Sequence, residues 1–287
     1  MRPQRQRVTF GWMILKPMVL SAAILTCGCT APIDDPNRQE NATELKVASG
    51  AGLSLTYSTN DFVEAGIRKE QKRSAEGLGN VVDEGFAPEH FCLYFEDTDH
   101  PLPPLEQGPR YFFPAHCFVC AIPLSDSSVE DFGAAYPTLS FAAVDLRKIL
   151  RERPEDLEQW RDVPDVPANN AGPSIFSRFQ YLDFRSGSGI AFLTQYSQEM
   201  EPNPVNNEEL ILSFQGLTDD GMYYLAGRLA VTHPSLPKGI DFTEHIERDK
   251  SYRYLRSAEE QLEGFSDESF RPSLKSLKAL LSSIHVE

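Results

Sequence analysis

Hydrophobic and polar residues alternate in several short stretches of this 287-residue chain. Alternation with a period of two is typical of a strand with one buried face. It predicts a strand over residues 53–57. Residues 90–95 and 117–122 are short runs rich in aromatic and apolar residues, which predict strands buried on at least one face. Four consecutive strands are predicted in the second half, over 179–184, 190–196, 210–217 and 222–231. Residues 61–73 are expected to form a short helix or loop.

Turn-forming residues separate the strands of the second half. Residues 185–189 (RSGSG) lie between the first two, and Asp219, Asp220 and Gly221 lie between the last two. Because Asp and Gly tolerate the backbone angles of tight turns, both segments predict hairpins between antiparallel strands.

Helical spacing appears at three places. Residues 139–153 carry an apolar stripe that ends at Pro154, and 243–264 and 270–284 carry apolar positions three and four residues apart. Strands followed by helices, without strict alternation, predict an α+β fold: an antiparallel sheet packed with helices.

The N-terminus has the pattern of an export signal. Four basic residues, at positions 2, 5, 7 and 16, precede an apolar run over 18–25. A transmembrane helix over 10–28 would place Lys16 near mid-membrane, at a cost of about 2.5–3.5 kcal/mol. A signal peptide needs only about 7–15 apolar residues. We therefore interpret 1–28 as a lipoprotein signal peptide.

Cys29 is the predicted lipidation site, because the small residue Gly28 precedes it. Cys27 is the alternative, and a cleaved signal without lipid is another. Residues 29–48 are polar and are interpreted as a flexible tether, followed by a single domain over 49–287. The expected location is the bacterial cell envelope, with the protein held to the outer membrane or an extracytoplasmic face by its lipid.

The formal net charge is −15 at pH 7, and the predicted signal contains no acidic residue. Nucleic acids and anionic headgroups need clustered Lys and Arg, so the charge argues against nucleic-acid binding. The sequence contains no Gly-rich phosphate loop or dinucleotide fingerprint, and no cofactor is expected.

Three further cysteines could pair in an oxidising compartment. On one strand, Cys117 and Cys120 would lie about 10 Å apart on opposite faces, too far for a disulfide. We expect Cys92 to pair with Cys117 or Cys120. Free buried thiols are one alternative. The second alternative is a zinc site, although we predict no bound metal. The possible ligands are His90, Cys92, His116, Cys117 and Cys120.

Catalytic patterns are weak, and no catalytic residue is predicted. The sequence lacks a G-x-S-x-G elbow, and Ser186 and Ser188 fit a hairpin turn better. His233 and Asp183 could be triad partners only by chance. Asp219 and Asp220 lack the ligand spacing of an EF-hand calcium loop. Five aromatic residues could line a pocket but more often belong to a core: Phe112, Phe113, Phe118, Tyr223 and Tyr224.

The second half contains a set of distinctive segments: 190–196 (IAFLTQY), 206–210 (NNEEL), 213–224 (SFQGLTDDGMYY), 233–237 (HPSLP) and 270–274 (FRPSL). Together they resemble an uncharacterised bacterial extracellular domain that occurs in lipoproteins and beside SH3-like modules. The resemblance implies an antiparallel sheet with helices, similar to the α/β/α sandwich of the PsbP-like fold. It carries no activity or catalytic residues to transfer.

These features predict a lipid-anchored envelope protein with a non-catalytic binding or scaffolding domain. Its partner, a protein or a small molecule, is left open. The alternative is an envelope hydrolase whose active site follows no motif.

Overall fold

The computed structural model describes residues 44–73, 87–97, 117–154, 163–166, 171–197, 204–239 and 248–287. The predicted signal peptide, Cys29 and most of the predicted tether lie outside these residues. Among these described residues, none of the helices combines the length and the hydropathy that a membrane span requires.

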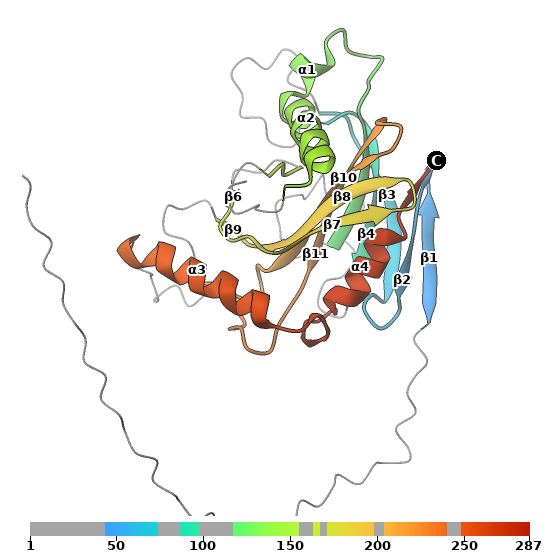
Figure 1. Ribbon diagram of the computed structural model, residues 1–287. Helices are drawn as coiled ribbons and strands as arrows, with labels where there is room; N and C mark the ends of the chain where they lie inside the picture. The colour runs from blue at the N-terminus through green and yellow to red at the C-terminus, as the bar shows by residue number, and fades with distance from the viewer. Residues whose placement is uncertain are drawn as a thin grey trace, which may run out of the picture. The chain divides into compact units, whose positions relative to one another are not determined.

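A seven-stranded antiparallel sheet forms the centre of the fold (Figure 1). Its strand order is β3-β4-β5-β11-β10-β8-β7. The four consecutive strands predicted in the second half are confirmed as neighbours in this sheet. The strands are β3 (Glu64–Glu70), β4 (His90–Glu96), β5 (Cys117–Pro123), β7 (Ser177–Phe184), β8 (Gly187–Thr194), β10 (Ile211–Thr218) and β11 (Tyr223–Ala230).

Two smaller sheets accompany it. The first joins β1 (Leu45–Gly50), β2 (Leu53–Ser58) and β12 (His285–Val286), and the second pairs β6 (Gly172–Pro173) with β9 (Tyr196–Ser197). Ala51 and Gly52, both with positive φ, make the two-residue turn from β1 to β2.

Two sequence expectations in this region are wrong. The predicted tether, 29–48, is too long, because its last residues form β1. The helix or loop expected over 61–73 contains strand β3.

The helices are α1 (Phe132–Ala135), α2 (Pro137–Glu152), α3 (Arg248–Gly264) and α4 (Leu274–Ser282), with a short 3₁₀ helix η1 (Asp267–Ser269). Arg153 ends α2 in the left-handed conformation, next to Pro154. The predicted helix over 270–284 begins later, at Leu274. There Ser273 caps it by accepting a hydrogen bond from the Ser276 N–H.

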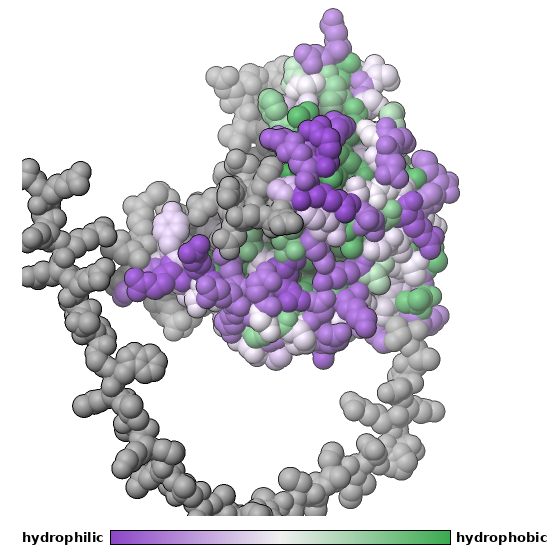
Figure 2. Space-filling view, in the orientation of Figure 1, coloured by the Kyte–Doolittle hydropathy of each residue, from purple (hydrophilic) through white to green (hydrophobic). Residues whose placement is uncertain are grey.

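Each face of the main sheet carries its own core. On one face, α2 buries Leu139, Leu146 and Ile149 with Phe118, Phe192 and Tyr224 of the sheet. On the other, α3, α4 and β2 bury Leu262, Leu277, Leu281, Leu53 and Leu55 with Leu93, Leu193 and Phe214. On the face seen in Figure 2, hydrophilic residues prevail where α3 lies. The α+β class predicted from the sequence is confirmed.

The hairpin between β7 and β8 has a shorter turn than predicted. Only Arg185 and Ser186 form the turn, and Gly187 and Gly189 belong to β8. A Cβ at Gly187 would lie 2.1 Å from the Leu217 carbonyl oxygen, and one at Gly189 would lie 2.5 Å from that of Gln215. These glycines therefore permit close packing inside the sheet.

Candidate functional site

A pocket of about 320 Å³ opens where the loop after β11 meets the segment before α4. Three chain segments form it, and each coincides with or adjoins a segment that carries the family resemblance. Its lining residues are Asn207, Thr232, His233, Pro234, Ser269 and Arg271.

The frame of the pocket is fixed by hydrogen bonds. Thr232 and Arg271 exchange two backbone bonds, at 2.8 and 2.9 Å. The side-chain oxygen of Asn207 accepts the His233 N–H at 2.7 Å, and its amide donates to the carbonyls of His233 and Leu236 at 3.1 Å each. The side chain of Asn207 therefore bonds to the loop after β11, and these bonds hold the pocket in one conformation.

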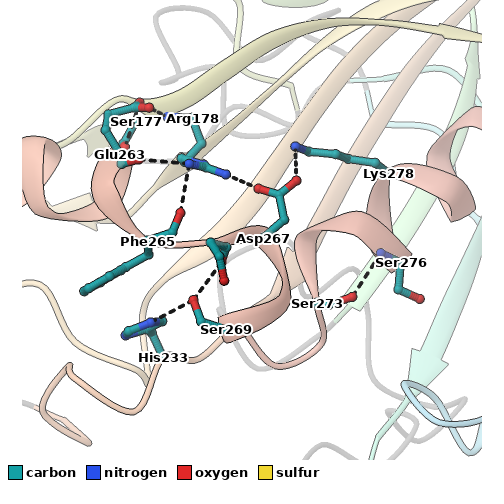
Figure 3. Close-up of polar contacts among 11 residues, drawn as sticks. Ser177, Arg178, His233, Glu263, Phe265, Asp267, Ser269, Ser273, Ser276 and Lys278 are labelled. Atoms are coloured by element: carbon teal, nitrogen blue, oxygen red, sulfur yellow. Dashed lines mark hydrogen bonds and ion pairs between the residues drawn. The ribbon is translucent and has the colours of Figure 1, made fainter.

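His233 is buried and has partners at both ring nitrogens. Its Nδ1 accepts the Ser235 N–H at 3.2 Å, and its Nε2 lies 3.0 Å from Ser269 Oγ. The ring stacks on Phe265 with 3.6 Å between centroids (Figure 3). Ser269 in turn donates its hydroxyl to the Ser266 carbonyl at 2.6 Å.

This hydrogen-bond pattern assigns the tautomer of His233. Because Nδ1 accepts a backbone N–H, the proton of the neutral ring lies on Nε2 and is donated to Ser269. Burial lowers the pKa of His233, which favours the neutral ring. A general base needs a lone pair directed at the nucleophile's proton, and His233 offers none to Ser269 in this arrangement.

The triad partners considered from the sequence are not brought together. Asp183 lies at the exposed end of β7 and pairs with Arg153 at 2.9 Å. Ser269, the actual partner of His233, gave no signal in the sequence, since it lies outside any nucleophile motif.

Arg271 supplies the positive charge of the pocket. Its side chain is exposed, and its Nη1 donates to the carbonyls of Glu268 and Phe270 at 2.7 Å each. These two bonds fix the guanidinium at the rim. An anionic group entering the pocket would meet an already oriented cation, whose charge also acts on the carboxyl group of Asp61.

Next to the pocket, an ion-pair network fastens the end of α3 to strand β7 (Figure 3). Arg178, at a bulge in β7 with a φ of 57°, donates to the carbonyls of Glu263 and Phe265 at 3.0 and 3.1 Å. It also pairs with Asp267, which accepts from Lys278 at 2.6 Å.

The protonation of Asp267 follows from this network. Partial burial alone would raise the pKa of Asp267, but the hydrogen bonds and charges of Lys278 and Arg178 outweigh it and lower the pKa. The carboxylate is therefore ionised at neutral pH and tethers η1, which carries Ser269, to both β7 and α4.

The structure contains one of the two disulfides expected from the sequence. Cys92 and Cys120 face each other across β4 and β5 and form a disulfide. Cys117 is a buried free thiol that accepts the Ala230 N–H at 3.2 Å, and burial raises its pKa to about 12. His90 lies beside the disulfide. His116 lies outside the described residues.

The remaining candidates have structural roles. Asp220 accepts from the Thr218 hydroxyl at 2.6 Å and from the Met222 N–H at 2.9 Å, which are bonds within the β10–β11 turn. Phe118 and Tyr224 are buried in the core facing α2, and Tyr223 packs on the opposite core. Phe112 and Phe113 lie outside the described residues.

Sequence reasoning also missed a buried ion pair. Arg228 of β11 donates to both carboxylate oxygens of Asp165, at 3.3 and 3.4 Å, and lies 4.6 Å over the ring of Tyr196. Tyr196 donates its hydroxyl to Asp165 at 2.7 Å, and burial raises its pKa. The pair holds residues 163–166 against the sheet.

No protein-family model matches this chain, and comparisons with curated proteins and with solved structures also find no match. The resemblance to the extracellular domain family and to the PsbP-like fold therefore stays a prediction. A function for the pocket therefore rests on the geometry of its residues.

Proposed function

We propose that the chain is a lipid-anchored protein of the bacterial envelope whose folded domain binds a ligand without transforming it. The ligand class that fits best is a small molecule or chain end with one anionic group, such as a carboxylate, held by Arg271 in the pocket.

The fixed guanidinium of Arg271 carries this proposal. The other polar groups of the pocket already bond to one another: Asn207 to the His233 loop, Ser269 to His233 and Ser266, and Thr232 to the Arg271 carbonyl at 3.2 Å. The exposed Arg271 side chain supplies a cation in a space of about 320 Å³, within the size range of small-molecule sites.

The second candidate is an envelope hydrolase with Ser269 as nucleophile. The contact of 3.0 Å between His233 and Ser269 favours it. The tautomer of His233 argues against it, because the ring donates to Ser269 and cannot accept its proton. Binding without turnover is the better-supported function.

Titration of the full chain with N-acetylalanine, a small carboxylate, tests the binding function by calorimetry. The Arg271→Gln variant should bind at least about tenfold more weakly, a difference of about 1.4 kcal/mol. Arg151→Gln, on the exposed side of α2, is the matched control and should bind as the wild type does. Equal affinity of the wild type and Arg271→Gln would refute the proposed site.

An ester such as p-nitrophenyl acetate separates the two functions. The binding proposal expects the same slow hydrolysis from the wild type and from Ser269→Ala. Turnover by the wild type that disappears in Ser269→Ala would establish the hydrolase instead.

A further inference from the structure

Three potential metal ligands meet on the face of the main sheet that packs against α2. His90 and Cys92 are two residues apart on β4, so their side chains lie on the same face. Cys120 of β5 lies directly opposite Cys92. A ring nitrogen of His90 and the two sulfur atoms lie within 4.8 Å of one another, and all three residues are buried.

We propose that His90, Cys92 and Cys120 bind Zn²⁺ when the Cys92–Cys120 bond is reduced, so that this trio exists either as a disulfide or as a metal centre. In a tetrahedral zinc site, with Zn–S of about 2.3 Å and Zn–N of about 2.0–2.1 Å, ligand atoms lie about 3.5–3.8 Å apart. Breaking the Cys92–Cys120 bond lets the two sulfurs separate toward that spacing, and the His90 ring nitrogen already lies within 4.8 Å of both.

The hydrogen bonding of His90 suits a zinc ligand. Its Nδ1 lies 2.8 Å from the Pro88 carbonyl oxygen, which can only accept, so Nδ1 carries the proton. The lone pair of the neutral ring is then on Nε2. A metal-ligating histidine almost always donates its other ring N–H to a carbonyl or carboxylate in this way.

Charge balance favours a divalent ion over a monovalent one. Two thiolates and a neutral imidazole around Zn²⁺ give a centre with no net charge, which is the least costly charge state in a buried site. Around Cu⁺ the same ligands would carry a net charge of about −1. Three protein ligands also leave the fourth zinc position to a water molecule.

Exchange between the two forms begins with the reduction of the disulfide. A dithiol gives two electrons and two protons to the Cys92–Cys120 bond and itself becomes a disulfide, which leaves two thiols. Zn²⁺ then replaces the two thiol protons, which are released. In the reverse direction, the two thiolates give two electrons to a disulfide, which takes up two protons and becomes a dithiol; the Cys92–Cys120 bond forms again and Zn²⁺ is released.

Cys117 provides the internal control. It is a buried cysteine three residues before Cys120 on the same strand, but its thiol lies in the core on the opposite face of the sheet. The proposal requires that metal binding be unaffected by Cys117→Ser.

The test uses the full chain with Cys27→Ser and Cys29→Ser, in mild detergent, because those two cysteines could themselves bind metal. The protein is unfolded, reduced with a phosphine and refolded without oxygen in the presence of Co²⁺ as a zinc probe. One Co²⁺ per chain should bind and show thiolate-to-cobalt charge-transfer absorption. The oxidised protein should bind none.

Loss of a residue that only supports a metal ligand weakens metal binding by about 10–100-fold. Because His90 is itself a proposed ligand, His90→Ala should weaken Co²⁺ binding by more than that. Cys92→Ser and Cys120→Ser should each abolish the charge-transfer band, and Cys117→Ser should retain it. Reduced protein that binds no stoichiometric Co²⁺, or a band that survives in His90→Ala at full affinity, would overturn the proposal.

A second measurement guards against variants that do not refold. Zn²⁺ should raise the thermal midpoint of the reduced wild type, because a ligand that binds only the folded state stabilises it. The His90→Ala variant can still form the disulfide, so its fold is checked in the oxidised form. Its reduced form should gain no thermal stability from Zn²⁺, and an equal gain would refute the site.

Discussion

At the scale of single residues, Asp267 makes the stability of the fold depend on pH. It is the shared anion of Arg178 and Lys278, with side-chain exposures of 23%, 18% and 24%. Asp267→Asn should destabilise the protein at pH 7 by about 1–3 kcal/mol, between the values for exposed and buried pairs. Urea unfolding measures this difference.

The pH dependence has a definite sign. Because the pKa of Asp267 is lowered in the folded state, its contribution is complete above the ordinary value of 3.8 and is lost as the pH falls through the folded-state pKa. The gap between wild type and Asp267→Asn should therefore close in the acid range below 3.8. Asp183→Asn, in an exposed pair with Arg153, should change stability by at most about 1 kcal/mol at any pH. A gap that stays constant down to pH 2 would contradict this account.

Gly189 is a second residue with a specific structural role. A methyl group there would approach the Gln215 carbonyl oxygen to 2.5 Å and the Phe214 ring to 2.7 Å. Gly189→Ala should cost about 1–3 kcal/mol of unfolding free energy through overpacking. Gly172→Ala is the control, because a methyl group there meets nothing within 4 Å. Thermal unfolding of both variants checks the difference, and an equally stable Gly189→Ala would be incompatible with the close strand packing.

Residue-level partners were the least predictable feature from sequence. The hydroxyl of Ser269 meets His233 across 36 positions of sequence, and Asp165 meets Arg228 across 63. Such contacts depend on the three-dimensional arrangement of distant segments, and no spacing in the chain encodes them. Cys92 and Cys120 were predictable as candidates because their chemistry is specific, but choosing Cys120 over Cys117 required the strand register.

At the scale of elements, α4 fastens the C-terminal part of the chain to the sheet. Leu277 is fully buried in the core that α4 shares with β2 and the main sheet. Leu277→Ala should cost about 2–5 kcal/mol, the usual range for a buried leucine. Lys275→Ala, on the exposed side of the same helix, should leave stability nearly unchanged. Chemical denaturation of both variants tests this, and similar midpoints would show that α4 is not part of the cooperative core.

Periodicity predicted most of the elements that have one buried face. It located α2, α4 and the strands of the second half within a few residues, because their apolar positions recur at the period of the structure. It missed β1, whose apolar Leu45 and Val47 are 66% and 69% exposed. It also missed β3, an edge strand of the main sheet with charged residues along most of its length. Edge strands bury little, so their sequences carry little pattern.

At the scale of the whole molecule, the sheet separates two possible centres. The pocket at His233 and Arg271 adjoins the core that contains α3 and α4, and the Cys92–Cys120 disulfide lies in the core that contains α2. The pocket could not be located from the sequence, because it combines segments that only the fold brings together. The residues of the second centre were among the sequence candidates, but the strand register was needed to select them.

The proposed anchor also belongs to this scale. Labelling with a palmitate analogue should mark the wild type and the Cys27→Ala control, and should fail for Cys29→Ala. The labelled protein should sediment with membranes, since each buried methylene of an acyl chain contributes ~0.8 kcal/mol and more than one chain makes attachment stable. Equal labelling of all three proteins would remove Cys29 as the lipidation site.

The disulfide between β4 and β5 also determines whether proteolysis separates the chain into two fragments. A single cut anywhere between residues 93 and 119 would leave two fragments still joined through Cys92 and Cys120. Nicked protein would migrate as one species on a gel without reductant and as two after reduction. Damage to that part of the chain would therefore not release either fragment until a reductant arrived.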